Sequence, residues 1–170
     1  MSGPSLLDKP IAFEPYWYEG SEIVKLPEVQ VSSEQTDFLE VFTQRRSVKQ
    51  LVGCPLDVLS KVLYLAVKPY CIAKDDYGVT VSRSAAPSAG GRHPIDILVG
   101  LKEKEDRKLY LYQPIGHSLK RLSVEKELQQ NFFKDVEQTL PFGESTLLWF
   151  SVQYMRTASK YSDPMSLIWR

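Results

Sequence analysis

Three cations and a hydroxyl group fall within five residues of the chain. They belong to Arg45, Arg46, Ser47 and Lys49. Guanidinium groups offer forked donors to the oxygens of a phosphate ester, and a serine hydroxyl adds a further donor. A basic helix C-terminus, stabilised by the helix dipole, is the simpler interpretation of the same run. The run therefore indicates either a phosphate-ester site or the end of a helix.

A run of small residues directly precedes an apolar stretch that begins at Ile95. Its members are Ala85, Ala86, Pro87, Ser88, Ala89, Gly90, Gly91, Arg92, His93 and Pro94. Small side chains let the backbone approach a flat ring closely, so that backbone N–H groups can hydrogen-bond its heteroatoms. A plain glycine turn that leads into a strand explains the same composition. The run is a candidate ring-binding loop, with the turn as the alternative.

Lys160 and Tyr161 form a third candidate, shortly after a strongly apolar stretch at residues 147–155. Functional residues often lie in loops at strand ends. A lysine whose pKa is lowered by burial can take part in proton transfer beside a tyrosine. A solvated lysine beside a half-buried aromatic ring is the structural alternative. His93 and His117 form no recognisable metal-ligand pattern with a cysteine or an acid, so we predict no metal site.

Helical periodicity predicts three helices around these candidates. They are expected at residues 36–46, 57–67 and 124–136. Thr36 or Asp37 is the expected N-cap of the first helix, and Asp57 that of the second. The expected core face of the second helix contains Val58, Leu59, Val62, Leu63 and Ala66.

Apolar and β-branched runs predict the strands. They are expected at residues 95–101, 109–112 and 147–155, the last as a central strand, with a short strand or a turn at 117–123. A charged hairpin loop is expected at 102–108, and residues 70–86 are predicted as loop. This order of helices and strands is typical of an α+β fold with a largely antiparallel central sheet flanked by helices.

Residues 1–34 are predicted as an extended N-terminal arm, and residues 35–170 as one domain. An aromatic cluster in the arm argues for docking on its own domain or on a partner, with a floppy tail as the alternative. The cluster comprises Phe13, Tyr16, Trp17 and Tyr18. The sequence stops at Arg170 within an apolar segment that has no capping signal, so we expect the domain to be incomplete at its C-terminal end.

The composition limits the classes of function. The chain has 170 residues, with Lys plus Arg at 21 and Asp plus Glu at 21, so its formal net charge is zero. This balance argues against nucleic-acid binding through phosphate neutralisation. No apolar stretch reaches the about 20 residues of a membrane span, and the first residues do not resemble a secretory signal. Cys54 and Cys71 alone define neither a disulfide framework nor a zinc site. We therefore expect a cytoplasmic protein without a nucleic-acid or membrane partner.

Four motifs in one order resemble the nitroreductase superfamily, and most closely its SagB-type (thiazole/oxazole-forming) FMN-dependent dehydrogenases. They lie at residues 45–49, 55–64, 87–94 and 156–161, with a similar lead-in at 23–27. The resemblance, over roughly residues 20–170, implies an FMN-binding α+β fold and an intertwined homodimer with flavin at the interface. It implies that the FMN phosphate and ribityl chain are held by Arg45, Arg46 and Ser47, with Lys49 as a helper. It also implies that the flavin ring is lined by Pro87, Ser88, Ala89, Gly90 and Gly91, with His93 beside it.

The same resemblance implies that Lys160 and Tyr161 are catalytic in the oxidation of azolines to azoles. A proton leaves carbon while hydride passes to the flavin. The implied partners are a cyclodehydratase complex and a precursor peptide. The alternatives are an NAD(P)H-dependent, nitroreductase-like reductase of small aromatics, or a non-catalytic subunit of a modification complex. Two features depart from the family: its domain continues past the position of Arg170, and Arg92 stands where an apolar residue is more frequent.

Overall fold

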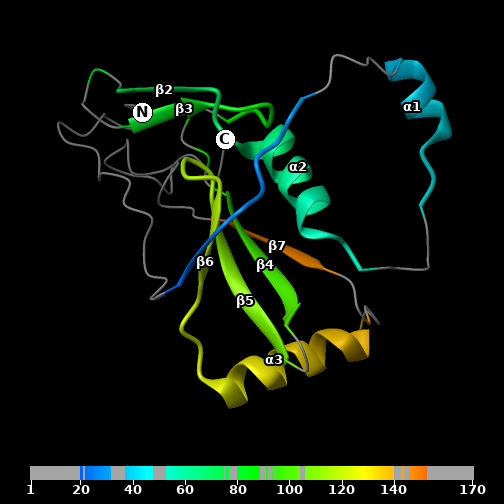
Figure 1. The fold of residues 1–170 in the computed structure, drawn as a ribbon, viewed down its shortest axis with the longest axis vertical. Coiled ribbons are helices and arrows are strands. Elements are labelled where there is room, and N and C mark those ends of the chain that lie inside the picture. Colours follow the sequence, from blue (N-terminus) through cyan, green and yellow to red (C-terminus); the bar gives the residue numbers. More distant parts are fainter. Residues whose placement is uncertain are drawn as a thin grey trace, which may run out of the picture.

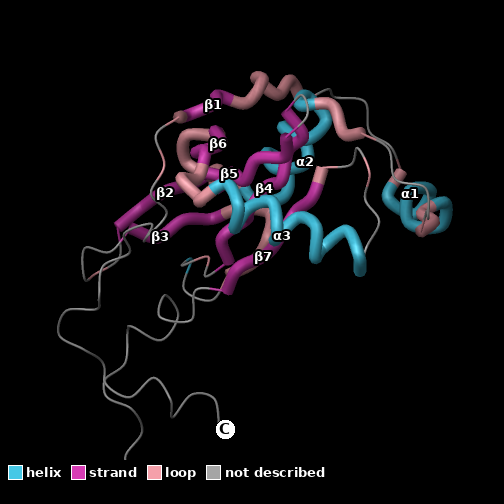
Figure 2. The backbone as a smooth tube through the Cα atoms, turned by 90° about the horizontal axis from the view of Figure 1, so that it is seen from below, coloured by secondary structure: helices cyan, strands magenta, loops and turns pink. Residues whose placement is uncertain are grey.

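The computed structural model of the protein describes residues 20, 22–31, 37–47, 53–74, 76, 80–88, 91, 93, 95–103, 106–139, 143 and 146–152. Its main feature is a five-stranded sheet in the order β1-β6-β5-β4-β7, which Figure 2 shows from one strand to the next. Every strand pair in this sheet is antiparallel. The predicted α+β class with an antiparallel sheet is therefore confirmed.

The long hairpin of β4 (Ile95–Glu103) and β5 (Asp106–Gln113) forms the middle of the sheet. Residues 102–108 were expected as a charged loop, but the ladder continues until Glu103 pairs with Asp106. Charged side chains do not prevent pairing here, because they can alternate outward while the backbone stays hydrogen-bonded. The Lys108 ammonium group also lies 3.2 Å from the Asp106 carboxylate at this end of the hairpin.

The outer positions of the sheet belong to β1 (Ile23–Lys25), which pairs with β6 (Ser118–Arg121), and to β7 (Leu147–Val152), which pairs with β4. The expectation of a central strand at 147–155 is wrong for the described part of the chain, where β7 is outermost. A continuous apolar run indicates burial but does not tell a central strand from an outer one. Phe150 on β7 is 63% exposed.

Helix α2 (Leu56–Val67) covers one face of the sheet. The core on this side consists of Leu26, Leu59, Leu63, Ile97, Val99, Tyr110, Tyr112 and Leu119. Two details of the prediction are wrong: Val58, Val62 and Ala66 are exposed, and the N-cap is Pro55 rather than Asp57. The helix instead turns Ser60 inward, where its hydroxyl has two hydrogen-bond partners.

Helix α3 (Lys126–Thr139) packs against the opposite face. Its Phe133 contacts Leu109 and Trp149, and Figure 1 shows the helix crossing the ends of β4 and β5. Gly100 on β4 makes this packing possible, because a Cβ atom there would lie 2.9 Å from the Trp149 ring and 3.0 Å from the Phe133 ring. Within the described residues, no helix is long and apolar enough to cross a membrane.

A second, two-stranded sheet lies in a region that was predicted as loop. Strands β2 (Cys71–Lys74) and β3 (Thr80–Arg83) pair in antiparallel register from Cys71 opposite Arg83 to Lys74 opposite Thr80. Each strand has only four residues and a mixture of polar and apolar side chains. Such short strands carry little periodicity, so their pairing was not visible in the sequence.

Helix α1 (Phe38–Gln44) stands apart from the other elements, as Figures 1 and 2 both show. The Asp37 carboxylate caps it by accepting hydrogen bonds from the backbone N–H groups of Leu39 (2.7 Å) and Glu40 (3.3 Å). This confirms one of the two expected caps. None of the seven helix residues is buried, and Phe38 and Phe42 stack on each other with ring centroids 6.0 Å apart.

Candidate functional site

The predicted phosphate-binding residues Arg45, Arg46 and Ser47 directly follow α1 and are exposed. Arg45 ends the helix, with its backbone N–H donating to the Val41 carbonyl at 3.0 Å. The Arg46 guanidinium donates to the carbonyl oxygens of Thr43 (2.6 Å) and Arg45 (2.9 Å). The basic helix end that the sequence offered as the simpler interpretation is therefore present. Arg45, Arg46 and Ser47 are also consecutive and exposed, and their guanidinium and hydroxyl groups are donors of the kind that suit phosphate.

The predicted ring-binding loop is organised by Ser88. Its carbonyl accepts the Gly91 N–H at 3.1 Å, and its Oγ accepts the His93 N–H at 2.7 Å. A serine hydroxyl that caps backbone N–H groups in this way stabilises a tight turn. Ser88 therefore stabilises the geometry of this loop. That Pro87 and Ser88 line a flavin ring stays a prediction.

The loop is pressed against strand β3. His93 Nε2 lies 2.9 Å from the Ser82 carbonyl oxygen, and because a carbonyl only accepts, this nitrogen carries the proton. Gly91 has a φ of +63°, and a Cβ atom on it would lie 2.8 Å from the same oxygen. His93 has a φ of +43°. The glycine is therefore required by approach to the protein's own backbone, whether or not a ring also binds there.

The end of α2 holds the start of this loop. The Ala66 carbonyl accepts the Ala86 N–H at 3.0 Å, and the Arg83 carbonyl of β3 accepts the Tyr70 N–H at 2.9 Å. Ser84, which is buried, donates its hydroxyl to the Ala86 carbonyl at 3.0 Å. Helix, hairpin and loop therefore form one hydrogen-bonded unit.

The structure does not bring the two candidate regions together within one chain. In both Figure 1 and Figure 2, α1 and its C-terminal end lie on the far side of the molecule from the β2–β3 hairpin, against which the loop is packed. The remaining predicted residues fall outside the described part of the chain. These are Lys49, Ala89, Gly90, Lys160 and Tyr161.

Sequence reasoning missed a polar cluster in which the half-buried His117 joins two buried residues, Ser60 and Tyr112. Its Nε2 lies 2.8 Å from Ser60 Oγ and its Nδ1 lies 2.9 Å from the Tyr112 hydroxyl. Burial lowers the pKa of His117, and the nearby Lys68 ammonium lowers this pKa further. Burial likewise raises the pKa of Tyr112, so its hydroxyl keeps its proton. The available signal was a serine on the apolar side of a predicted helix, which requires a buried partner.

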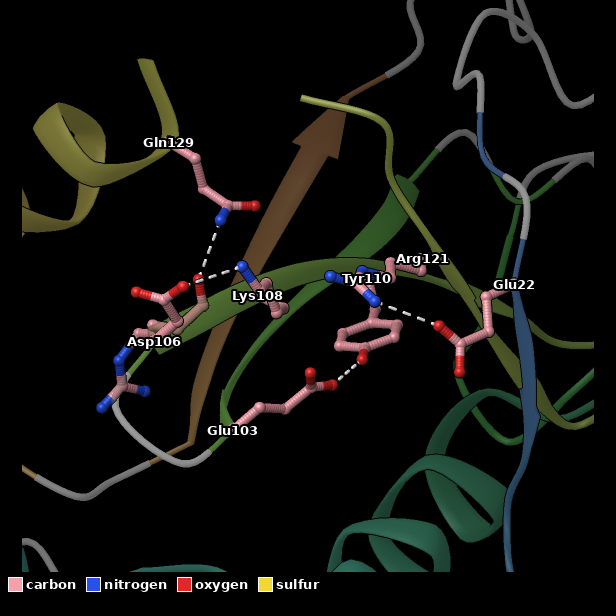
Figure 3. Close-up of polar contacts among 8 residues, drawn as sticks. Glu22, Glu103, Asp106, Lys108, Tyr110, Arg121 and Gln129 are labelled. Carbon is pink, nitrogen blue, oxygen red and sulfur yellow. Dashed lines mark hydrogen bonds and ion pairs between the residues drawn. The ribbon is translucent and has the colours of Figure 1, made fainter. Parts of the chain in front are cut away.

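A second set of polar side chains joins neighbouring strands at the edge of the α2-facing core (Figure 3). The Tyr110 hydroxyl donates to Glu103, and the pKa of Tyr110 is raised by burial first and by this hydrogen bond second. The Arg121 guanidinium lies 3.1 Å from the Glu22 carboxylate, which raises the pKa of Arg121. These groups are paired with each other, so they stabilise the sheet rather than form an open reactive centre.

The other polar contacts in Figure 3 attach α3 and close the β4–β5 hairpin. Gln129 is buried and donates to the Arg107 carbonyl at 2.9 Å. A hydrogen bond from Lys108 lowers the pKa of Asp106. Across the residues that the structure describes, no group of three or more histidine, cysteine or acidic side chains could hold a metal ion.

Comparison with known proteins identifies the fold. No protein-family model and no curated protein matches the chain. A candidate nitroreductase from Ralstonia eutropha has a TM-score of 0.52 and 22% sequence identity over 91% of this chain and 66% of its own. A candidate nitroreductase from Anabaena variabilis has a TM-score of 0.59 and 23% identity over 94% of this chain and 30% of its own. The chain thus spans about two thirds of one neighbour and under a third of the other, and it has a nitroreductase-like α+β fold.

Proposed function

We propose that the protein is an FMN-dependent oxidoreductase that dehydrogenates azoline rings to azoles in a modified peptide or a related small molecule. The observation that carries the proposal is the likeness of its fold to two candidate nitroreductases. The azoline specificity rests on the resemblance at Lys160 and Tyr161. Bound FMN would supply the acceptor for hydride, which is chemistry that amino-acid side chains lack.

The described residues fit the proposed cofactor at its phosphate end. Arg45 and Arg46 present exposed guanidinium groups at the end of α1, and Ser47 adds a hydroxyl. Charge-assisted hydrogen bonds from guanidinium to phosphate are among the stronger polar contacts in proteins. The run of small residues around Gly91 supports the ring end of the proposal, because small side chains leave the loop backbone accessible to a flat ring.

The separation of these two regions supports a site shared by two copies of the chain. The guanidinium pair follows α1, whereas the loop belongs to the unit built by α2 and the β2–β3 hairpin. Helix α1 also exposes apolar side chains that a second copy would cover. These are Phe38 (75% exposed), Leu39, Val41 and Phe42. In the proposed homodimer, one subunit supplies the phosphate-binding end and its partner supplies the ring-binding loop.

The chain's own residues would then move the proton. We assign Lys160 to take the proton from the azoline carbon and Tyr161 to orient the ring or share that proton. For the reaction to balance, the substrate loses one proton and one hydride. A lysine accepts a proton only when neutral, so this role requires an environment that lowers its pKa.

Subunit mixing tests the cofactor and the shared site together. Arg45→Ala removes a phosphate contact, and Gly91→Ala disturbs the loop; each homodimer should bind FMN weakly. When the two variants are co-expressed with different tags and purified as a mixed dimer, one of its two sites combines an intact Arg45 with an intact loop. We expect the mixed dimer to recover about half of the parental FMN content.

Two different results would contradict two different parts of the proposal. A parental protein that binds no FMN would contradict the cofactor. A parental protein that binds FMN, together with a mixed dimer that recovers none, would contradict the shared site and would place the whole site within one chain.

A further inference from the structure

Four residues form a directed chain of hydrogen bonds beneath α2. The Ser60 hydroxyl lies 2.7 Å from the Pro27 carbonyl oxygen, and because a carbonyl only accepts, Ser60 donates its single proton there. Ser60 Oγ must therefore accept from His117 Nε2, which is 2.8 Å away. His117 Nδ1 consequently carries no proton and accepts from the Tyr112 hydroxyl at 2.9 Å. The arrangement requires a neutral imidazole with its proton on Nε2.

This chain of hydrogen bonds joins four parts of the fold. Tyr112 lies on β5, His117 ends the turn between β5 and β6, Ser60 lies in the middle of α2, and Pro27 follows β1. The His117 carbonyl also accepts the Leu26 N–H at 3.3 Å. His117 adopts a φ of +46°, a conformation that residues other than glycine rarely adopt without support from their surroundings.

We propose that His117 is a pH-sensitive latch, which holds α2 on the sheet while its imidazole is neutral and makes transient release of α2 more frequent when the imidazole takes a second proton. Through the hydrogen bond between the Ala66 carbonyl and the Ala86 N–H, release of α2 also loosens the loop that contains Gly91. The latch is independent of any cofactor, since every contact in it belongs to the chain.

Protonation disrupts the chain of hydrogen bonds at Nδ1. A proton there faces the Tyr112 hydroxyl, so two donors oppose each other and Tyr112 must turn its own proton elsewhere. Tyr112 is 3% exposed, so water does not readily take that proton. A buried donor without an acceptor destabilises the folded state, so protonation of His117 weakens the chain of hydrogen bonds beneath α2.

The groups that face His117 disfavour its charged form. From α2, the Tyr64 ring packs edge-on against the imidazole with centroids 5.4 Å apart, and the Lys68 ammonium lies 4.4 Å from the Tyr64 centroid. From β5 the neutral Tyr112 hydroxyl faces the imidazole, and from the segment after β1 the Pro27 carbonyl accepts the hydrogen bond of Ser60. Burial, and then Lys68, lower the pKa of His117 below its ordinary 6.5. The latch therefore stabilises the fold fully above pH 6.5 and loses its contribution as the pH falls through the lowered value.

Hydrogen exchange with NMR detection tests the latch in the parental protein. The chain has two histidines, so the His117 ring signal is identified by its loss in His117→Asn. We expect the protection of the Ala86 and α2 amides, corrected for intrinsic exchange, to fall about fivefold or more on acidification, as for the loss of one buried hydrogen bond. The midpoint of this fall should coincide with the measured pKa of His117. A midpoint unrelated to that pKa, or no fall, would overturn the proposal.

Matched variants separate the latch from general destabilisation. Tyr112→Phe removes the donor to Nδ1, so the pKa of His117 and the midpoint of α2 opening should both rise. Tyr110→Phe is the control, since Tyr110 lies on the same strand and is equally buried but donates to Glu103. His117→Asn tolerates positive φ and does not titrate, so its amide protection should lose the pH dependence. Equal shifts in the two tyrosine variants, or an unchanged pH dependence in His117→Asn, would refute the latch.

Discussion

Gly91→Ala probes the close approach between the small-residue loop and strand β3. Gly91 has a φ of +63°, and an added methyl group would lie 2.8 Å from the Ser82 carbonyl oxygen, closer than real Cβ contacts allow. The substitution must therefore adopt a strained backbone and push the loop away from β3. Gly143 is a matched control, because its φ is +52° and a Cβ atom there would meet nothing within 4 Å.

The two substitutions should lower the free energy of unfolding by different amounts, because only an added methyl group at Gly91 meets the Ser82 carbonyl oxygen. A left-handed backbone conformation destabilises a residue that has a Cβ atom by about 1–2 kcal/mol. This destabilisation is expected in both variants. At Gly91 the displaced loop also loses the 2.9 Å hydrogen bond from His93 to Ser82. Such a bond contributes about 0.5–1.5 kcal/mol net. We expect losses in the free energy of unfolding of about 1.5–3.5 kcal/mol for Gly91→Ala and about 1–2 kcal/mol for Gly143→Ala.

Urea unfolding followed by circular dichroism measures both losses under one set of conditions. Hydrogen exchange then locates the effect: the His93 and Ala86 amides should lose protection in Gly91→Ala and keep it in Gly143→Ala. If Gly91→Ala costs no more than Gly143→Ala, the loop does not press on β3 and the reasoning is wrong.

Further substitutions test other parts of the account. Arg45→Ala should weaken FMN binding about tenfold or more through the loss of charge-assisted bonds, whereas Lys61→Ala, which removes the same charge from α2, should not; equal affinities would contradict the phosphate contact. Gly100→Ala should lower the free energy of unfolding by about 1–3 kcal/mol, because its Cβ atom would overpack the rings behind β4; an unchanged urea midpoint would refute that packing. Lys160→Ala and Tyr161→Phe should keep FMN and lose about 10²–10⁴-fold in turnover; near-parental rates would favour a generic reductase or a non-catalytic subunit.

Elements with strong local patterns were predictable from the sequence. The apolar spacing of α2 and the two apolar runs of the β4–β5 hairpin identify these elements. Apolar residues recur there at the spacing of a helix or a strand, and this repeat is visible in one sequence. Strands β2 and β3 were missed because four-residue strands of mixed polarity have no such period. The outer position of β7 was missed because pairing order depends on the partners of a strand and not on its own residues.

The sequence identified candidate site residues by their type, but it did not indicate which contacts those residues make. Arg46 does hold the end of α1, as the simpler interpretation of the basic run suggested. The contact of His93 with Ser82, however, joins residues eleven positions apart through a hairpin that was not predicted. The latch at His117 spans 57 positions to Ser60, so only tertiary structure could reveal it.

The most direct test of the central claim compares the binding of FMN and riboflavin by the purified full-length protein, using equilibrium dialysis. The two ligands share the flavin ring and the ribityl chain and differ in the phosphate. We predict one FMN bound per chain, an affinity for FMN about tenfold or more above that for riboflavin, and loss of this preference in Arg45→Ala. Absence of saturable FMN binding, or equal affinities for the two flavins in the parental protein, would contradict the account.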